Sequence, residues 1–237
     1  MSSKVAAFFD LDRTLIDVNS GFLWAQHERR SGGIGPVQFA RVAFWSAMYH
    51  LSLINMEKAY GVAVAHYRGI SAASLAERTN QWFARDIEHR LQPGAAVAIE
   101  EHRNLGHRLV LLTNTSCYEA QAASDTWRFD DWLANRFHED EAGNLIGTYE
   151  LPLCYGPGKV AHAENWAKQH DVDLAKSFFY SDSYSDLPML ERVGHPRIVN
   201  PDPRLLRAAK RRAWPILVWN QRQATDLAGV HQSKTSQ

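Results

Sequence analysis

Apolar and polar positions follow two different rhythms along this chain, and the change of rhythm divides it into regions. Residues 5–9 form a short apolar run, which predicts a buried β-strand. Residues 18–92 have a helical pattern throughout, whereas from residue 93 apolar runs alternate with helical segments. This order predicts an α/β core with a parallel sheet and an all-helical insertion after the first strand.

The insertion is expected to consist of consecutive helices. Asn19 or Ser20 can cap the first, and Pro36 suits the first position of the second. Ser74 has the S-x-x-E spacing of a capping box for the last, although Ser71 could cap it instead. Aromatic residues of the insertion are expected to pack these helices together, with a few lining a pocket. The helices are predicted over residues 20–30, 36–51, 56–67 and from the Ser71–Ser74 region to 90.

The rest of the chain predicts the alternating core. Strands are expected over residues 108–113, 134–138, 177–181, 197–199 and 215–218, and helices over residues 95–105, 119–129, 158–170, 186–192 and 203–211. A Glu-Ala-Gly-Asn stretch at residues 141–144 predicts a hairpin turn. The predicted division is a core of residues 1–17 and 93–220, an insertion of residues 18–92 and a polar tail of residues 221–237.

Composition excludes several classes of function. The 237 residues include 26 Lys plus Arg and 26 Asp plus Glu, so neither a nucleic-acid surface nor a polybasic membrane patch is expected. No signal peptide is apparent, and the most apolar helical stretch, residues 37–54, is short and interrupted by Arg41 and His50. We therefore expect a cytoplasmic protein without a membrane partner.

Cysteines and histidines point to no further metal or redox site. Cys117 and Cys154 form no C-x-x-C pair, which favours two reduced thiols, with Cys117 expected to be a small buried residue. The 11 histidines have no spacing typical of zinc ligands. His102 and His107 flank a predicted helix end and are expected to be exposed.

The segment Asp10-Leu11-Asp12-Arg13-Thr14 directly follows the first predicted strand. Ligands of open α/β sheets bind at the carboxyl ends of the strands, so both carboxylates lie where a ligand is expected. Two negative charges so close repel each other, which predicts a hard metal cation between Asp10 and Asp12 and an anionic substrate nearby. Ordinary turn chemistry is the alternative explanation of the acids.

Three more segments bring reactive groups to the same edge of the predicted sheet. Thr113 ends an apolar strand, and Asp182 ends another. Lys159 lies at a helix start, where a positive charge is unfavourable unless it reaches an anion. Asp186 could cap the next helix, or it could hold metal-bound water or Lys159. An ordinary strand-end threonine and an exposed lysine are the alternatives, but together these groups suit phosphoryl transfer.

With these four blocks the chain resembles the haloacid dehalogenase-like (HAD) hydrolases. The blocks DLDRT, Thr113, Lys159 and SDSYSD occur in the order of that family, and the match covers nearly the whole chain. The resemblance implies a Rossmann-like parallel sheet sandwiched by helices, with the helical insertion forming a C1-type cap. The layout is similar to the phosphoserine-phosphatase-like branch, subfamily IB.

The resemblance also implies catalytic roles. Asp10 would be the nucleophile that takes the phosphoryl group as an aspartyl phosphate. Asp12 would protonate the leaving alcohol and then activate water, which fits a phosphatase better than a dehalogenase. Thr113 and Lys159 would hold the phosphoryl oxygens.

Mg²⁺ is the cofactor that the resemblance implies. It would be bound by Asp10, the backbone carbonyl of Asp12 and Asp182, with Asp186 acting as a ligand through water or holding the neighbouring groups. The expected function is Mg²⁺-dependent hydrolysis of a small-molecule phosphomonoester, and a phosphotransferase that uses the same site is the alternative.

Substrate contacts are expected from Thr14, Asn114 and Asn19, and from the side of the insertion that faces the Asp loop. Phosphoserine phosphatases carry a glutamate nine residues after the nucleophile, where this chain has Asn19, and their second block also differs from Thr113-Asn114-Thr115. A neutral asparagine does not compensate the desolvation of the serine ammonium group, which argues against phosphoserine. Some relatives in this branch resemble histidinol-phosphate phosphatases, so the resemblance implies histidinol phosphate as the specific substrate ahead of phosphoserine. The oligomeric state stays open.

Overall fold

The core of the molecule is a sheet of six parallel strands. A computed structural model describes residues 4–40 and 56–219. The strand order is β3-β2-β1-β6-β7-β8, and every neighbouring pair is parallel. The bounds are β1 Ala6–Phe9, β2 Arg108–Ser116, β3 Asp131–Asn135, β6 Phe178–Ser181, β7 His195–Val199 and β8 Ile216–Leu217.

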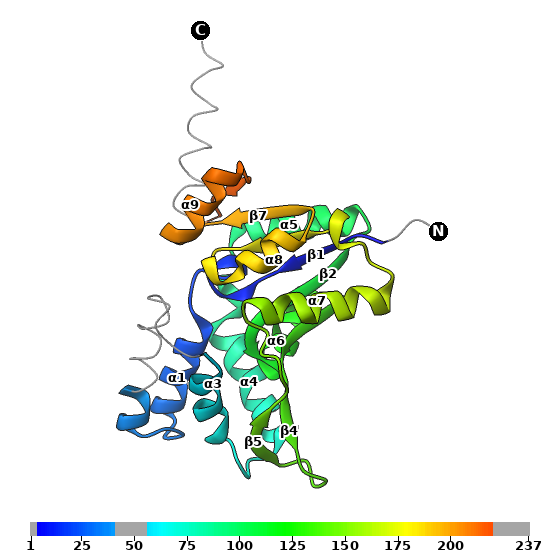
Figure 1. Cartoon of the computed structure of the whole chain (residues 1–237). Helices are drawn as coiled ribbons and strands as arrows, with labels where there is room; N and C mark the ends of the chain where they lie inside the picture. The colour runs from blue at the N-terminus through cyan, green and yellow to red at the C-terminus, as the bar shows by residue number, and fades with distance from the viewer. Residues whose placement is uncertain (1–3, 41–55, 220–237) are drawn as a thin grey trace.

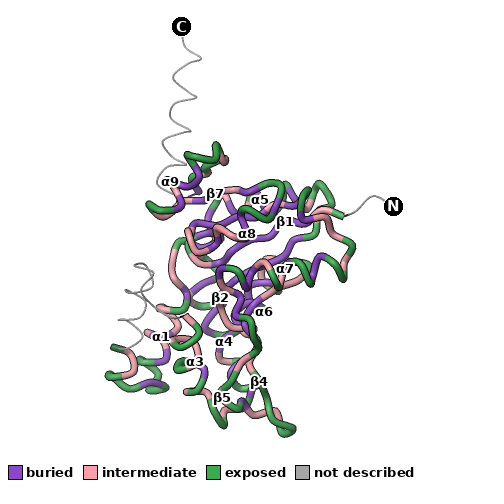
Figure 2. Tube along the Cα trace, in the orientation of Figure 1, coloured by how far each residue is buried: buried purple, intermediate pink, exposed green. Residues whose placement is uncertain are grey.

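Helices cover both faces of this sheet, because side chains of a strand alternate between its faces. Phe9 belongs to the hydrophobic cluster beneath α5 (Pro93–Asn104) and α6 (Cys117–Trp127). Phe8 belongs to the opposite cluster, which includes residues of α7 (Pro157–His170), α8 (Leu187–Arg192) and α9 (Pro203–Arg212). Figure 2 shows β1 and β2 buried between exposed outer helix faces. The predicted α/β fold class is thus confirmed.

The segment between β1 and α5 is helical in its described parts. It contains α1 (Ser20–Arg30), α3 (Met56–Ala65) and α4 (Ala72–Asp86), in the lower half of Figure 1. The Asn19 side chain accepts the N–H of Phe22, and Ser71 accepts that of Ser74, so these are the caps rather than Ser20 and Ser74. A helix also starts at Pro36, and the remainder of the helix predicted over 36–51 lies outside the described residues.

One predicted strand, over residues 134–138, is in fact part of two strands. β3 ends at Asn135 in the main sheet, and β4 (Phe137–Glu139) pairs antiparallel with β5 (Leu145–Tyr149) across the predicted turn. The chain leaves the sheet there because the rings of Phe137 and Tyr149 pack edge-on against Tyr60 of α3. The hairpin therefore lies with the helical segment, in the lower half of Figure 1.

The expectation that His102 is exposed is wrong. His102 is only 4% exposed, and its Nε2 lies 2.9 Å from the Tyr180 hydroxyl. Its ring also contacts Phe9 and Phe178 edge-on. The last turn of α5 thus turns His102 towards the sheet, where a polar ring is tolerated because it is hydrogen-bonded.

Other expectations concern the ends of the chain and its thiols. The predicted tail of residues 221–237 lies outside the described residues, and most of the apolar stretch 37–54 does too. In the described ranges, every helix is too short or too polar to cross a bilayer. Both cysteines are free thiols: Cys154 is buried, whereas Cys117 is only partly so.

Candidate active site

Three neighbouring strands of the sheet end in the groups that the sequence singled out. Asp10 directly follows β1, Thr113 lies in the last half of β2, and Asp182 directly follows β6. The chain after β1 makes one wide turn, closed by the bond from Ile16 N–H to the Leu11 carbonyl at 3.1 Å, in which Arg13 has a left-handed φ of 57°. Because β2, β1 and β6 are adjacent, their carboxyl ends bring these side chains to one edge.

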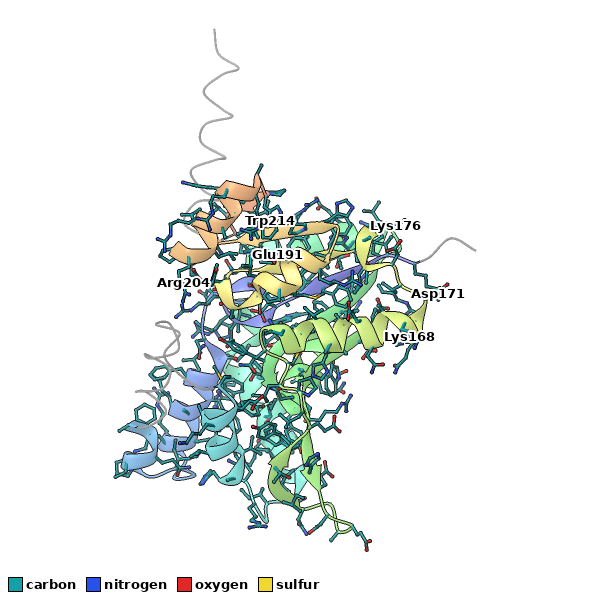
Figure 3. The ribbon with its side chains drawn as sticks, viewed as in Figure 1. Lys168, Asp171, Lys176, Glu191, Arg204 and Trp214 are labelled. Atoms are coloured by element: carbon teal, nitrogen blue, oxygen red, sulfur yellow. The ribbon has the colours of Figure 1, made fainter. Side chains whose placement is uncertain are left out.

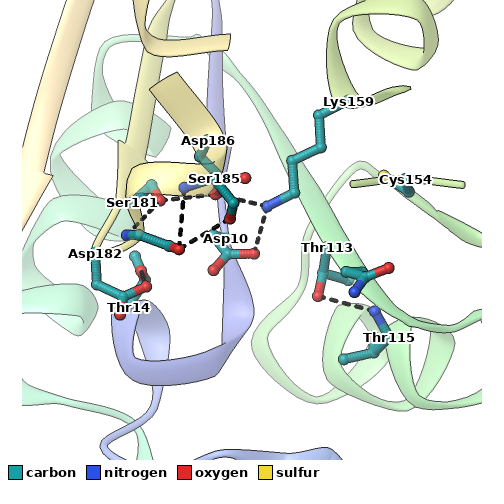
Figure 4. Close-up of polar contacts among 12 residues, drawn as sticks. Asp10, Thr14, Thr113, Thr115, Cys154, Lys159, Ser181, Asp182, Ser185 and Asp186 are labelled. Carbon is teal, nitrogen blue, oxygen red and sulfur yellow. Dashed lines mark hydrogen bonds and ion pairs between the residues drawn. The ribbon is translucent and has the colours of Figure 1, made fainter. Parts of the chain in front are cut away.

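Lys159 reaches this edge from the first turn of α7. Its Nζ lies 2.7 Å from Asp10 Oδ1 and 2.8 Å from Asp186 Oδ2, and its side chain is 3% exposed (Figure 4). The first turn of α7 packs against the backbone of Leu153 at Gly158. Only glycine fits there, since a Cβ atom would lie 1.8 Å from the Leu153 carbonyl oxygen. The ammonium group therefore pairs with two carboxylates, which offsets its unfavourable place at a helix N-terminus.

Asp186 holds Lys159 rather than capping the next helix. The Ser181 hydroxyl also donates to Asp186 Oδ2, at 2.7 Å, and the Asp186 side chain makes no capping bond to α8. Of the two roles left open by the sequence, the structure therefore supports a fixed partner of Lys159 over a cap.

Burial makes the ionised form of the carboxylates at this edge less favourable. Burial raises the pKa of Asp10 to about 7, although the Lys159 ammonium acts in the opposite direction. Burial and then the charges of Asp10 and Asp186 raise the pKa of Asp182 well above its ordinary value. Burial alone would lower the pKa of Lys159, but the two carboxylates beside it raise it instead. Lys159 therefore stays charged, while the carboxylates need more positive charge than it supplies.

A divalent cation fits this excess of negative charge. Asp10 and Asp182 carry hard oxygen donors, the kind that Mg²⁺ prefers, and each residue is 8% exposed. However, no group of three or more Asp, Glu, His or Cys residues in residues 4–40 and 56–219 is arranged to hold a metal ion. Any further ligands at this place would be backbone carbonyls or water.

The cation expected between Asp10 and Asp12 stays a prediction. One oxygen of the Asp12 side chain, Oδ1, accepts the backbone N–H of Ser20, at 2.9 Å, at the first residue of α1. The orphan N–H groups of a helix start attract a carboxylate, which explains the direction of this side chain. Burial raises the pKa of Asp12, and its bonds to Ser20 act against that rise.

Of the other predicted site residues, Thr113 and Asn114 line the cavity, whereas Thr14 does not. Thr113 is 1% exposed, and its Oγ1 accepts the N–H of Thr115 at 3.3 Å. Asn114 lies in the cavity wall, with its Oδ1 bonded to Asn135 at 3.0 Å. Thr14 is fully buried outside the cavity wall and donates to Asp182 Oδ1 at 3.3 Å, so it positions Asp182 rather than meeting substrate as expected.

A cavity of about 360 Å³ opens from this edge towards the helical segment. One end is formed by Asp10, Asp182, Asp186 and Lys159. The other end is formed by side chains of α1, α3, α4 and the β4–β5 hairpin. Aromatic residues of the insertion do line it, as the sequence analysis expected for a few of them. The aromatic residues in its wall are Phe22, Trp24, Tyr60, Tyr67, Trp82, Phe137 and Tyr155.

Sequence reasoning missed three acids in this cavity wall, Glu28, Glu119 and Asp202. Asp202 caps α9 by accepting the N–H groups of Arg204 and Leu205. Glu28 of α1 is 2% exposed and pairs with Arg78 of α4. Glu119 of α6 is 5% exposed, and burial and then the Asp12 charge raise its pKa to about 8. Glu119 stands three residues after the helix cap Ser116, so the sequence signal was an ordinary capping box. Such a pattern gives no hint that the carboxylate faces a cavity.

The chain is similar in sequence and fold to known proteins. The family model for haloacid dehalogenase-like hydrolases matches residues 7–191. The chain is 30% identical to the "Inhibition of morphological differentiation protein" of Streptomyces azureus, over 90% of this chain and 78% of that protein. It is 25% identical to a histidinol-phosphatase of Neisseria meningitidis serogroup C (strain 8013), over 90% and 98%. A crystal structure of a protein of unknown function from Bordetella pertussis Tohama I superimposes with a TM-score of 0.83, at 26% identity over 91% and 99%.

Proposed function

The chain belongs to the haloacid dehalogenase-like hydrolases and is a phosphatase, and on that premise we propose that it hydrolyses a small-molecule phosphomonoester with Mg²⁺ as cofactor. The observation that carries the proposal is the buried triad of Asp10, Lys159 and Asp186 at one end of the cavity. A carboxylate held beside a permanently charged ammonium is a nucleophile prepared for an anionic substrate.

Asp10 is the proposed nucleophile. Lys159 favours its ionised form against the effect of burial, so an oxygen of Asp10 is able to attack phosphorus. The bond from phosphorus to the leaving oxygen breaks as the new bond forms, which gives an aspartyl phosphate and an alcohol. Lys159 and Thr113 bind the phosphoryl oxygens during this transfer, and Mg²⁺ would add positive charge beside Asp10 and Asp182.

Asp12 is the proposed acid and base. Its raised pKa favours a proton on the carboxyl group, which it gives to the leaving oxygen. The resulting carboxylate then takes a proton from water, whose oxygen attacks the aspartyl phosphate and releases inorganic phosphate. The bond from Ser20 N–H holds Asp12 at the join between core and insertion, where a leaving alcohol would lie.

Histidinol phosphate is the specific substrate that we propose ahead of phosphoserine. The support is the similarity to the histidinol-phosphatase of Neisseria meningitidis, 98% of whose length this chain covers. Asn19 stands in place of the glutamate of phosphoserine phosphatases, which argues against phosphoserine. Asn19 and Asn114 both lie in the cavity wall and are proposed to contact substrate.

The test uses p-nitrophenyl phosphate with and without Mg²⁺, for the wild type and Asp10→Asn. We expect Mg²⁺-dependent release of phosphate by the wild type, and a loss of at least about a thousandfold in Asp10→Asn. Trapping with labelled substrate and acid quench should give a hydroxylamine-sensitive acyl phosphate in the wild type. Hydrolysis by Asp10→Asn at the wild-type rate would refute the nucleophile. Exposed Asp125→Asn on α6 is the matched control, and added glycerol detects transfer to an alcohol.

A further inference from the structure

Glu119 is a buried acid beside Ser20 and Asp12, and one oxygen of its carboxylate lacks a hydrogen-bond partner. The residue is 5% exposed and lines the cavity, yet its Oε1 has no hydrogen-bond partner among the described residues. A buried, unpaired polar atom costs free energy, and native proteins rarely retain one without a use. The Oε1 atom is therefore an acceptor that faces a ligand space.

Helix α6 needs the backbone of Glu119 but not its carboxylate. The Ser116 side chain accepts the N–H of Glu119 at 3.3 Å, as in a capping box. In a complete capping box the glutamate side chain returns a bond to the N-cap N–H, and Oε1 of Glu119 makes no such bond. Capping thus explains why the helix begins here, and leaves the carboxylate unexplained.

The other acids of the cavity wall have identified partners. Glu28 pairs with Arg78, and Asp10 and Asp186 share Lys159. In the described part of the chain, by contrast, no ion pair joins Glu119 to a Lys, Arg or His. The cavity wall therefore contains one carboxylate oxygen, Oε1 of Glu119, that a bound molecule would have to satisfy.

The surroundings of Glu119 indicate what that molecule carries. The cavity wall presents the rings of Trp24, Tyr60, Tyr67 and Phe137, and aromatic faces attract cations. The Thr115 hydroxyl, also in the wall, is a second buried atom without a described hydrogen-bond partner. A carboxylate, a hydroxyl and aromatic faces together favour a nitrogen cation that donates hydrogen bonds.

We propose that Glu119 binds a protonated nitrogen on the leaving alcohol, so that the substrates are phosphomonoesters of alcohols bearing an amine or imidazole group. This inference rests on the proposed function and adds a recognition site in the cavity wall beside Asp12, the proposed acid and base. The carboxylate accepts the N–H of the cation there, and the aromatic wall encloses the rest of the alcohol. Glu119 would therefore determine specificity without taking part in phosphoryl transfer.

The test compares two esters that differ in one charged group: 4-(aminomethyl)phenyl phosphate and 4-ethylphenyl phosphate. For the wild type we expect kcat/KM to be at least about tenfold higher for the aminomethyl ester. Glu119→Gln should lower the ratio of the two kcat/KM values by about tenfold, mainly through KM of the aminomethyl ester. Asp125→Asn removes an exposed carboxylate from the same helix and should leave the ratio as it is.

The outcomes separate this inference from the proposed function. Equal kcat/KM for both esters in the wild type, or an equal loss for both in Glu119→Gln, would overturn the inference alone. If Asp10→Asn hydrolysed both esters as fast as the wild type, or the wild type hydrolysed neither, the proposed function would fail and the inference with it. The wild-type ratio decides the matter even if Glu119→Gln does not fold.

Discussion

The two ends of the cavity are built on different principles. At the core end, Lys159 bonds to Asp10 and Asp186, and Ser181 holds Asp186 in turn. Elsewhere the cavity wall carries aromatic side chains and the unpaired Oε1 of Glu119. The end that would meet every phosphoryl group is fixed in advance, as electrostatic catalysis requires. The end that would meet the variable alcohol leaves one acceptor for the ligand to satisfy.

Removing the cation of the core end should have the largest effect. In Lys159→Met the carboxylates of Asp10 and Asp186 lose their shared partner while staying buried. Leaving buried charges unpaired typically costs about 3–5 kcal/mol, and loss of one charge-stabilising donor costs about 10²–10³ in kcat. Urea unfolding at pH 8 and turnover of p-nitrophenyl phosphate measure the two effects.

Lys168→Met is the matched control for this prediction. Lys168 is an exposed lysine of the same helix, labelled on the outer side of α7 in Figure 3. Its removal should change the free energy of unfolding by less than about 0.5 kcal/mol. A Lys159→Met protein as stable as this control would show that the core end is not held together by its charges.

A cation added to the core end should produce the next largest effect. If Mg²⁺ binds the folded state beside Asp10 and Asp182, it stabilises the wild type by about 2.7 kcal/mol at a hundred times its Kd. Asp182→Asn removes one hard oxygen donor and should abolish most of this gain. Thermal unfolding with MgCl₂ and with EDTA measures it, and an equal Mg²⁺ shift in both proteins would remove Asp182 from the metal site.

The core end could be predicted from the sequence, because a residue that follows an apolar run lies at the carboxyl end of a strand. An apolar run followed by Asp10, and another followed by Asp182, fix where both residues lie once the sheet is parallel. The partner of Lys159 also followed from its unfavourable position at a helix start. The bond between Asp12 and the Ser20 N–H could not be predicted, because it depends on the position of the α1 N-terminus.

The other end could not be predicted in the same way. Glu119 and His102 both lie on helices, and a helical position alone does not say which face is covered by a distant segment. His102 is buried by strand residues far from it in sequence, and Glu119 by the arrangement of helices around the cavity. The division of residues 134–138 between β3 and β4 could not be predicted for the same reason. It depends on the packing of the β4–β5 hairpin against α3, which is distant in sequence.

The pH dependence of stability should sharpen the contrast between the ends. Burial raises the pKa of Glu119 from its ordinary value of 4.5 to about 8. The folded state therefore binds a proton that the unfolded state has lost, so the contribution of Glu119 to stability falls as pH rises from about 4.5 to 8. Glu119→Gln abolishes this fall and should be more stable than the wild type at pH 8.5, by about 1–3 kcal/mol.

The same two proteins should be equally stable at about pH 3, below the ordinary pKa of 4.5, where Glu119 is protonated in both states. Thermal unfolding of metal-free protein at the two pH values gives the comparison, with Asp125→Asn as the exposed control. Destabilisation by Glu119→Gln at pH 8.5 would mean that the carboxylate has a structural partner, and the leaving-group end would then be as fully bonded as the core end.

The smallest effect concerns Asn19, where the leaving-group end meets the start of α1. Its Oδ1 accepts the N–H of Phe22 at 2.8 Å, so Asn19→Ala should cost about 1 kcal/mol of stability through the lost cap. Asn19→Ser keeps a capping oxygen and should unfold like the wild type, but it lacks the amide N–H₂ that we propose contacts substrate.

A loss of one neutral hydrogen bond corresponds to a fall in kcat/KM of about two- to tenfold. Stability and kcat/KM measured on both variants separate the two roles: a wild-type kcat/KM in Asn19→Ser would assign Asn19 to the helix cap alone, and recognition of the alcohol at this end would then depend on Glu119 and the aromatic wall.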